Sequence, residues 1–192
     1  GSDSRIGTKF LYPGAGFGGS CFPKDLRAVI STAEQAGVSL KILSAVQEVN
    51  ERQKHLPVER VIEHFGGTLA GRKIAVWGLA FKPGTDDLRD APALVIIEDL
   101  LTAGASVAAA DPVAIPLARK RPGLGIDLLD NNYQCAEGAD ALILVTEWRE
   151  YRRPNFERLH GLMRTPVLVH GRNVRDPADA RAAGFTYFGL AR

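Results

Sequence analysis

The sequence has 192 residues, of which 45% are hydrophobic and 24% are charged, as is ordinary for a soluble globular protein with one core and an appendage. The basic residues behind the formal net charge of +2 are spread along the chain, so no basic stripe indicates a nucleic-acid-binding protein. No apolar run approaches the ~20 residues of a membrane helix, and no signal-peptide pattern opens the chain, which argues against a membrane protein.

The first predicted elements are helices. After a glycine-rich stretch over residues 1–20, residues 26–33 place apolar side chains at i, i+3, i+4 and i+7, and Gly37 ends this helix. A second helical pattern follows up to residue 65, and Pro57 predicts a kink or a break within it.

From residue 72 onward, short apolar runs alternate with helical patterns. Runs such as KIAVWG and DALILVTEW are typical of strands buried on both faces, and the alternation predicts an α/β fold with a doubly wound, mostly parallel sheet. We therefore divide the chain into a helical arm within residues 1–67 and an α/β domain over residues 68–192.

The two cysteines, Cys21 and Cys135, lie far apart in dissimilar contexts. Free thiols in a cytoplasmic protein are therefore expected rather than a disulfide. The chain has no initiator methionine and opens in what reads as a loop from the middle of a protein, so we interpret it as a fragment.

The stretch GFGGSCFPKD places Cys21 directly before a helix that Pro23 is suited to begin. Free backbone N–H groups and the positive end of the helix dipole favour a thiolate at that position. Lys24 adds a positive charge, and Asp25 can accept a proton or orient a water molecule beside the sulfur. These are the parts of an activated nucleophile with an adjacent base.

A lone cysteine is more often a small buried hydrophobic residue than a nucleophile. For Cys21 the glycine cluster, the predicted helix start and the charged neighbours favour the nucleophile. Cys135 has no such surroundings, so we interpret it as a structural residue.

Four motifs carry a resemblance to a known family. PGAGFGGSCFPKD resembles the active-site segment of the UDP-glucose/GDP-mannose dehydrogenase family, and GLAFKPGTDDLRDAPA, ADALILVTEW and GRNVRDP resemble its C-terminal nucleotide-sugar-binding domain, in the same order. The resemblance implies that residues 1–67 are part of the central helical domain and that residues 68–192 are the Rossmann-like UDP-sugar-binding domain. It also implies that the N-terminal Rossmann domain, which holds NAD, is missing from this fragment.

Enzymes of this family oxidise the C6 alcohol of a nucleotide sugar to a carboxylate with two NAD. The resemblance implies that Cys21 attacks the intermediate aldehyde, giving a thiohemiacetal and then a thioester, while Asp25 positions or deprotonates the hydrolytic water. The TEW and GRN motifs favour UDP-glucose as substrate and UDP-glucuronate as product over GDP-mannose, and a UDP-N-acetylhexosamine is favoured less. The family's catalytic lysine and asparagine lie upstream, so the fragment itself is expected to be inactive.

The resemblance assigns binding residues position by position. It implies that Arg5 reaches the substrate of a neighbouring subunit, that Arg89 contacts NAD, and that the long central helix forms a homodimer interface. The other substrate-binding residues are Tyr12, Pro13, Gly14, Ala15, Gly16, Phe17, Gly18, Phe81, Lys82 and Arg172. The other cofactor-binding residues, which line the nicotinamide region, are Cys21, Phe22, Pro23 and Lys24.

Lone arginines and lysines are usually solvated surface residues, but Lys82 and Arg172 each follow a predicted strand, where open α/β sheets bind ligands. The turn GLAFKPG lacks the GxGxxG fingerprint of a dinucleotide site. We interpret Asp86 and Asp87 as caps or loop charges, and the four histidines show no ligand spacing, so we expect no metal site. A hypothesis from another class is that the chain serves only as a nucleotide-sugar-binding and dimerisation module.

Overall fold

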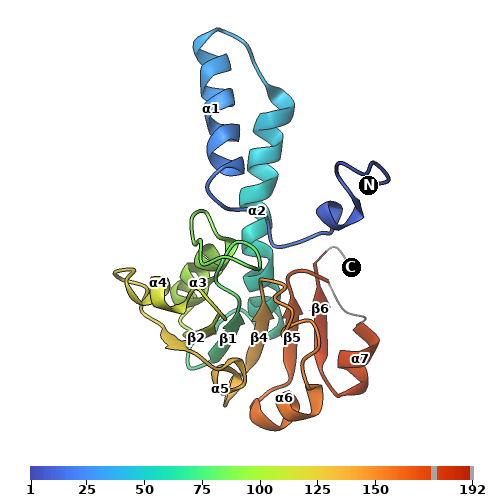
Figure 1. The fold of residues 1–192 in the computed structure, drawn as a ribbon. Coiled ribbons are helices and arrows are strands. Elements are labelled where there is room, and N and C mark those ends of the chain that lie inside the picture. The colour runs from blue at the N-terminus through green and yellow to red at the C-terminus, as the bar shows by residue number, and fades with distance from the viewer. Residues whose placement is uncertain (174–176, 191–192) are drawn as a thin grey trace.

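The computed structural model describes residues 1–173 and 177–190, which form two visibly different parts (Figure 1). One part is a hairpin of two helices that projects from the molecule, and the other is a sheet covered by helices. A short 3-10 helix, η1 (Thr8–Leu11), precedes them and lies to one side of the hairpin. No helix in these two ranges is both long and apolar enough to cross a membrane.

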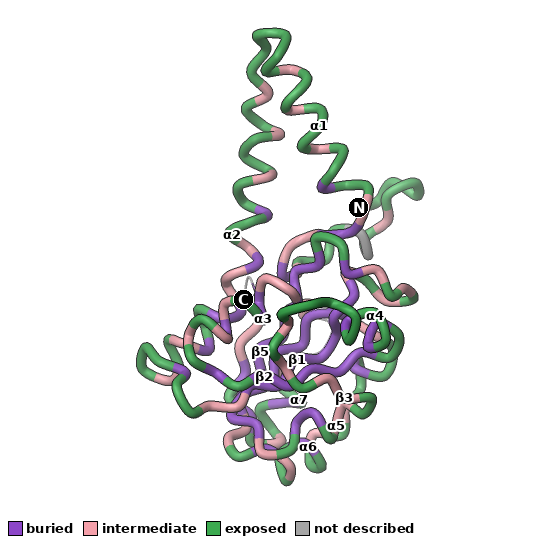
Figure 2. Tube along the Cα trace, turned by 90° about the vertical axis from the view of Figure 1, so that its left-hand side faces the viewer, coloured by how far each residue is buried: buried purple, intermediate pink, exposed green. Residues whose placement is uncertain are grey.

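The hairpin consists of α1 (Phe22–Gln35) and α2 (Lys41–His64). Gly37 lies in the connection with a φ of 73°, a left-handed conformation that suits glycine at the end of a helix. From here on we keep the name arm for the projecting part alone, which is α1 together with α2 up to Val49. Figure 2 shows that most of the arm is exposed, whereas the rest of α2 enters the buried part of the molecule.

Of the kink or break predicted at Pro57, the break does not occur, because α2 runs through this residue as one helix. A proline inside a helix removes one backbone hydrogen bond and would normally disrupt it. Here Pro57, Val58 and Val61 are buried against the α/β part, and tertiary packing of this kind keeps a helix formed where local propensity would end it.

The sheet confirms the predicted α/β class. We predicted a mostly parallel sheet, and all pairings among the six strands are parallel. The strand order is β3-β2-β1-β4-β5-β6, so the chain winds outward from β1 in both directions. The strands are β1 (Lys73–Trp77), β2 (Ser106–Ala110), β3 (Asp127–Leu129), β4 (Ala141–Leu144), β5 (Val167–His170) and β6 (Thr186–Gly189).

Helices cover both faces of the sheet, as the alternation along β1 shows. Ile74 and Val76 point into one core cluster with α2, α3 and α4, whereas Ala75 and Trp77 point into a second cluster with α5, α6 and α7. The part of α2 after Val49, which we call its lower half, therefore belongs to the helical layer on one face of the sheet. The part up to Val49 is its upper half. These helices are α3 (Pro92–Thr102), α4 (Ile115–Arg119), α5 (Asn132–Ala136), α6 (Phe156–Leu162) and α7 (Pro177–Ala182).

The stretch between β2 and β4 contains three elements that the sequence pattern does not predict, namely α4, the three-residue edge strand β3 and α5. These elements are too short for their apolar residues to show a period, and β3 is buried only in part. The side chain of Asn131 caps α5 by accepting the N–H of Gln134 at 3.0 Å.

Candidate active site

Cys21 occupies the position immediately before α1, as expected from the sequence. Pro23 lies in the first turn and is buried, whereas the Cys21 side chain is exposed and its thiol is free. The sulfur lies 3.6 Å from the hydroxyl oxygen of Ser20. The thiol therefore faces solvent at the end of the helix where unpaired N–H groups and the helix dipole attract negative charge.

Cys135 has the opposite environment. It is fully buried on α5, and burial raises the pKa of its thiol to about 12. Its Sγ lies 3.2 Å from the carbonyl oxygen of Ala108 on β2. This placement agrees with a structural role, because a thiol held neutral and away from solvent is not a nucleophile.

Three charged groups surround the start of α1. The Lys24 ammonium lies 3.4 Å from the carboxylate of Asp25, whose backbone N–H donates to the Cys21 carbonyl at 2.8 Å, one helical turn away. Arg89 comes from the loop after β1. The pKa of its guanidinium is raised mainly by hydrogen bonds to Asp87, with a smaller contribution from the charge interaction with Cys21. The structure thus brings Arg89 into the electrostatic neighbourhood of the thiol.

The segment of residues 12–20, which we call the glycine loop, packs closely on the loop between β1 and α3. A Cβ atom at Gly18 would collide with the backbone of Asp90, and one at Gly19 would lie 2.8 Å from the ring of Phe81. The N–H of Gly19 donates to the carbonyl of Arg89 at 2.8 Å. Only glycine permits so close an approach at these two positions. This contact joins the segment that carries Cys21 to the α/β part.

The other end of the glycine loop meets Arg172, which follows β5. Its guanidinium covers Gly14, where a Cβ atom would collide with it. Glu147, in the TEW motif after β4, holds the guanidinium in an ion pair with an Nε–Oε2 distance of 2.8 Å. The glycine loop therefore spans from Arg172 to Phe81 across the carboxyl edge of the sheet.

The remaining predicted ligand residues differ in exposure. Tyr12, Pro13, Lys82 and Phe22 are exposed, and the Nζ atom of Lys82 lies 5.3 Å from the centroid of the Phe81 ring. Ala15 is buried in the core, so its side chain anchors the loop and only its backbone is placed to meet a ligand.

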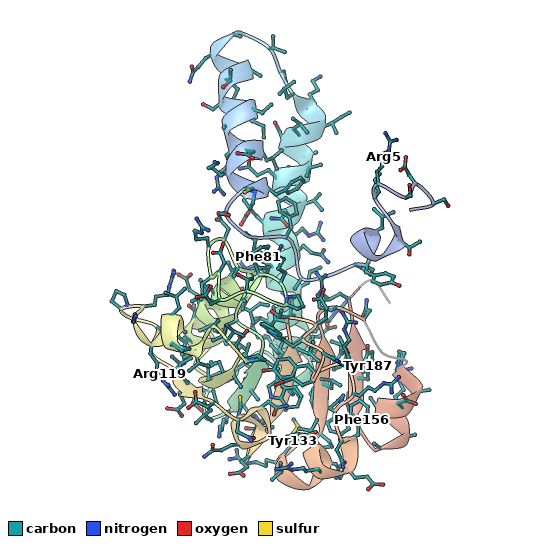
Figure 3. The ribbon with its side chains drawn as sticks, viewed as in Figure 1. Arg5, Phe81, Arg119, Tyr133, Phe156 and Tyr187 are labelled. Atoms are coloured by element: carbon teal, nitrogen blue, oxygen red, sulfur yellow. The ribbon has the colours of Figure 1, made fainter. Side chains whose placement is uncertain are left out.

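Arg5 is not brought to the site within one chain. Figure 3 shows it far from Phe81, on the N-terminal segment beside the arm. Its guanidinium forms an exposed ion pair with Asp3, with an N–O distance of 2.7 Å. A role for Arg5 in a neighbouring subunit stays a prediction.

Two models of protein families match the chain. The model of the UDP-binding domain of the UDP-glucose/GDP-mannose dehydrogenase family matches residues 75–177, and that of the central domain matches residues 1–52. The chain belongs to this family. The resemblance inferred from the four motifs is confirmed.

Relatives in the family are similar over the whole chain. UDP-glucose 6-dehydrogenase from Pseudomonas aeruginosa is 53% identical, and that from Rhizobium meliloti is 43% identical. Each comparison covers 100% of this chain but 44% of the relative, so the chain spans less than half the length of these proteins. The solved structure of a UDP-glucose dehydrogenase from Pyrobaculum islandicum is 36% identical with a TM-score of 0.85, covering 100% of this chain and 41% of the other.

Sequence reasoning missed two residues of α2 that hold the glycine loop of this family member. The backbone N–H of Phe17 donates to Oδ1 of Asn50 at 2.7 Å, and Nδ2 of Asn50 donates to the carbonyl of Phe17 at 3.2 Å. Nε2 of Gln53 donates to the carbonyl of Gly14 at 3.0 Å. Two amide residues three positions apart on a polar helix face carry no sequence signal of this role.

Asp111, also missed, follows β2 and is almost fully buried. Its carboxylate accepts hydrogen bonds from the Trp148 indole at 3.1 Å and from four backbone N–H groups, those of Leu79, Ala80, Val113 and Ala114. In dinucleotide-binding sheets, an acidic residue near this position binds a ribose hydroxyl. Because Asp111 is committed to protein groups, the geometry agrees with the absence of a dinucleotide fingerprint after β1.

The residues predicted to contact NAD lie together at the start of α1. Phe22 and Lys24 are exposed in the first turn of α1, directly after Cys21, and the N–H of Gly19 joins this segment to the carbonyl of Arg89 at 2.8 Å. An exposed aromatic ring and cationic side chains are groups that can bind a planar ring carried on phosphates. Within the described ranges, no group of three or more His, Cys, Asp or Glu side chains could hold a metal ion.

Proposed function

We propose that this chain is the thiol-bearing and nucleotide-sugar-binding part of an NAD-dependent dehydrogenase that converts UDP-glucose to UDP-glucuronate. The observation that carries the proposal is the exposed thiol of Cys21, which stands at the start of α1 beside Arg89. The similarity to UDP-glucose 6-dehydrogenases supports the choice of substrate. The boundary between the two domains of the family lies near residue 67 in this proposal.

The thiol has a defined task in this reaction. Bound NAD supplies the acceptor for the hydrides that leave the C6 carbon. The Cys21 thiolate adds to the aldehyde carbon formed by the first oxidation, giving a thiohemiacetal, and the second oxidation leaves the acyl group on sulfur as a thioester. Water then attacks the acyl carbon, the C–S bond breaks and the thiolate is released with the carboxylate. Asp25, one helical turn from Cys21, positions this water or accepts its proton.

Other residues of the chain bind and orient the two ligands. The residues from Tyr12 to Gly18 wrap the sugar and its phosphates, and the ammonium of Lys82 meets a diphosphate oxygen or a sugar hydroxyl. The Arg172 guanidinium, preorganised by Glu147, provides a further substrate contact. Phe81 supports Lys82 and contacts the sugar. On the cofactor side, Phe22, Pro23, Lys24 and Arg89 line the nicotinamide region, and Arg5 reaches the substrate of the second subunit of a cytoplasmic homodimer.

GDP-mannose is the second candidate substrate, because the family includes dehydrogenases of both nucleotide sugars. A further alternative is that the chain only binds a nucleotide sugar and dimerises. Titration calorimetry of this chain with UDP-glucose and with GDP-mannose distinguishes the two candidate substrates. We expect heat of binding with UDP-glucose and none with GDP-mannose. Preferred binding of GDP-mannose would overturn the choice of sugar.

A joined enzyme tests the chemistry. It consists of the N-terminal part of the Pseudomonas aeruginosa relative followed by this chain in place of the corresponding portion. We expect the joined enzyme to form two NADH per UDP-glucuronate, and the 192 residues alone to form none. The Cys21→Ala variant should bind UDP-glucose and yield no UDP-glucuronate, because no thioester can form. Undiminished UDP-glucuronate from this variant would remove Cys21 from the mechanism.

A further inference from the structure

Asn50 is the α2 residue most closely joined to the glycine loop. Its side-chain amide pairs with both backbone groups of Phe17, at 2.7 Å and 3.2 Å, and only 5% of the residue is exposed. We propose that Asn50 is a positioning residue that sets the location of the Cys21 thiol for attack on the aldehyde. This inference rests on the proposed function, because it gives the amide a role in the same thiol chemistry.

The glycine loop depends on side chains for its placement. Among the described residues, the backbone–backbone hydrogen bonds that join residues 12–20 to another segment comprise a single bond, from the N–H of Gly19 to Arg89. The other backbone partners come from α2, with two bonds to Asn50 and one to Gln53. Asn50 therefore pairs with the backbone N–H and C=O groups of Phe17, which lie outside any strand or helix.

The loop is shaped around the amide of Asn50. Gly16 adopts a φ of 96°, and a Cβ atom there would lie 3.0 Å from Oδ1 of Asn50. A side chain at this position would push the loop away from the helix. The close approach and the two hydrogen bonds therefore fix Phe17 relative to α2.

The position of Phe17 is transmitted to the thiol over a short path. The rings of Phe17 and Phe22 are in edge-to-face contact with centroids 4.6 Å apart, and Phe22 is the first residue of α1. Cys21 lies between this contact and Gly19, which is bonded to the α/β part. The backbone that carries the thiol is thus held from two sides, by Asn50 through Phe17 and by Arg89 through Gly19.

Asn50 is a suitable reference because the helix that carries it is anchored in the core. Val58 and Val61, two and three turns further along α2, are buried in the core cluster of the α/β part. The amide therefore keeps a fixed position with respect to the sheet edge that carries Arg172 and Phe81.

Hydrogen–deuterium exchange of the 192-residue chain tests the placement of the loop. Asn50→Ala should raise the amide exchange rates of residues 16–21 by about tenfold or more and leave those of β1 unchanged, because the loop loses two of its attachments. The control Gln47→Ala lies one turn earlier on α2 and should leave the loop rates unchanged. A second control, Leu159→Ala, truncates a fully buried side chain on α6 in the other core cluster and should leave the loop rates unchanged. Loop exchange rates in Asn50→Ala equal to those of Gln47→Ala would overturn the inference.

Trapping of the aldehyde tests the chemical consequence in the joined enzyme. A misplaced thiol cannot capture the aldehyde efficiently, so Asn50→Ala should increase the semicarbazide-trapped aldehyde and lower kcat, each by about tenfold or more. Leu159→Ala should lower the melting temperature without increasing the trapped aldehyde, which separates positioning from general stability. No increase in trapped aldehyde would overturn the positioning role. An inactive wild-type joined enzyme would instead count against the proposed function, and the exchange experiment would still decide whether Asn50 holds the loop.

Discussion

The two halves of α2 have the same secondary structure and opposite surroundings. In the lower half Val58 and Val61 are 2% and 0% exposed, whereas in the upper half Ile42 and Val49 are 80% and 63% exposed. Apolar residues in the lower half find their partners on α3 and the sheet, and those in the upper half find few in the same chain. The difference indicates that one helix performs two tasks, since it closes the α/β core below and presents an apolar surface above.

The largest expected effect comes from charging the lower half. Val61→Asp should cost about 4 kcal/mol or more of unfolding free energy, because the carboxylate would be buried without a partner. Urea unfolding followed by circular dichroism measures the loss. At a concentration low enough to keep the chain monomeric, the matched substitution Val49→Asp should change the unfolding free energy by less than about 0.5 kcal/mol. Equal losses at the two positions would show that the halves do not differ.

Charging the upper half should instead break self-association. We expect the wild-type chain to have a light-scattering mass near twice its 20.7 kDa, and the double variant Val46→Asp, Val49→Asp to have the monomer mass. The reason is that the exposed apolar face would carry two charges into the interface. Glu48→Ala, on the exposed part of the same helix, is the control. A wild-type chain that stays monomeric at tens of micromolar would contradict this expectation.

A smaller effect is expected at the junction between α2 and α3. Nδ1 of His55 lies 2.6 Å from Oδ2 of Asp99, and the two side chains are 45% and 28% exposed. Asp99→Asn should lower the unfolding free energy by about 0.5 kcal/mol, as is usual for a partly exposed pair. Urea unfolding of the variant and of Arg60→Gln, which leaves this pair intact, provides the measurement. A loss above that of Val61→Asp would place the main attachment of α2 at this pair and not in the core.

The smallest expected effect concerns the loop between β1 and α3, where the carbonyl of Arg89 accepts a hydrogen bond from Gly19. Hydrogen bonds from Arg89 hold the pKa of the Asp87 carboxyl below its ordinary value of 3.8. Such a carboxylate contributes stability above the unfolded-state pKa, and the contribution is lost as the pH falls through the folded-state pKa. In Arg89→Gln the pKa of Asp87, followed by NMR titration, should rise toward 3.8. Lys24→Gln, which alters the pair with Asp25, should leave the Asp87 titration unchanged.

The sequence was sufficient for the parts of the fold that repeat a pattern. Buried runs such as residues 73–77 and 167–170 predict strands because both of their faces are covered. The three-residue strand β3 could not be found this way, since it is short and only half-buried. Pro57 was misjudged as a possible break because the packing that keeps α2 whole comes from residues far away in the sequence.

The residues of the candidate site also differ in whether the sequence alone can indicate them. Cys21 and its helix start are local features, so GGSCFPKD is enough to indicate them. Asn50 is joined to Phe17 across 33 positions, and Glu147 to Arg172 across 25. Side-chain partners at such separations leave no period or motif in a single sequence, so only the folded chain reveals them.

Because α2 is continuous through Pro57, a movement at one end of the helix is transmitted to the other end. With a rise of 1.5 Å per residue, Asn50 lies about 16 Å above the anchored Val61, and the tip of the helix lies about 30 Å above it. A rotation of about 5° at the foot would move Asn50 by roughly 1.5 Å and the tip by roughly 2.5 Å, if the helix stays straight. A break at Pro57 would absorb such a movement. The unbroken helix transmits it, so a displacement of the exposed tip of α2 would reach the glycine loop at about half its amplitude.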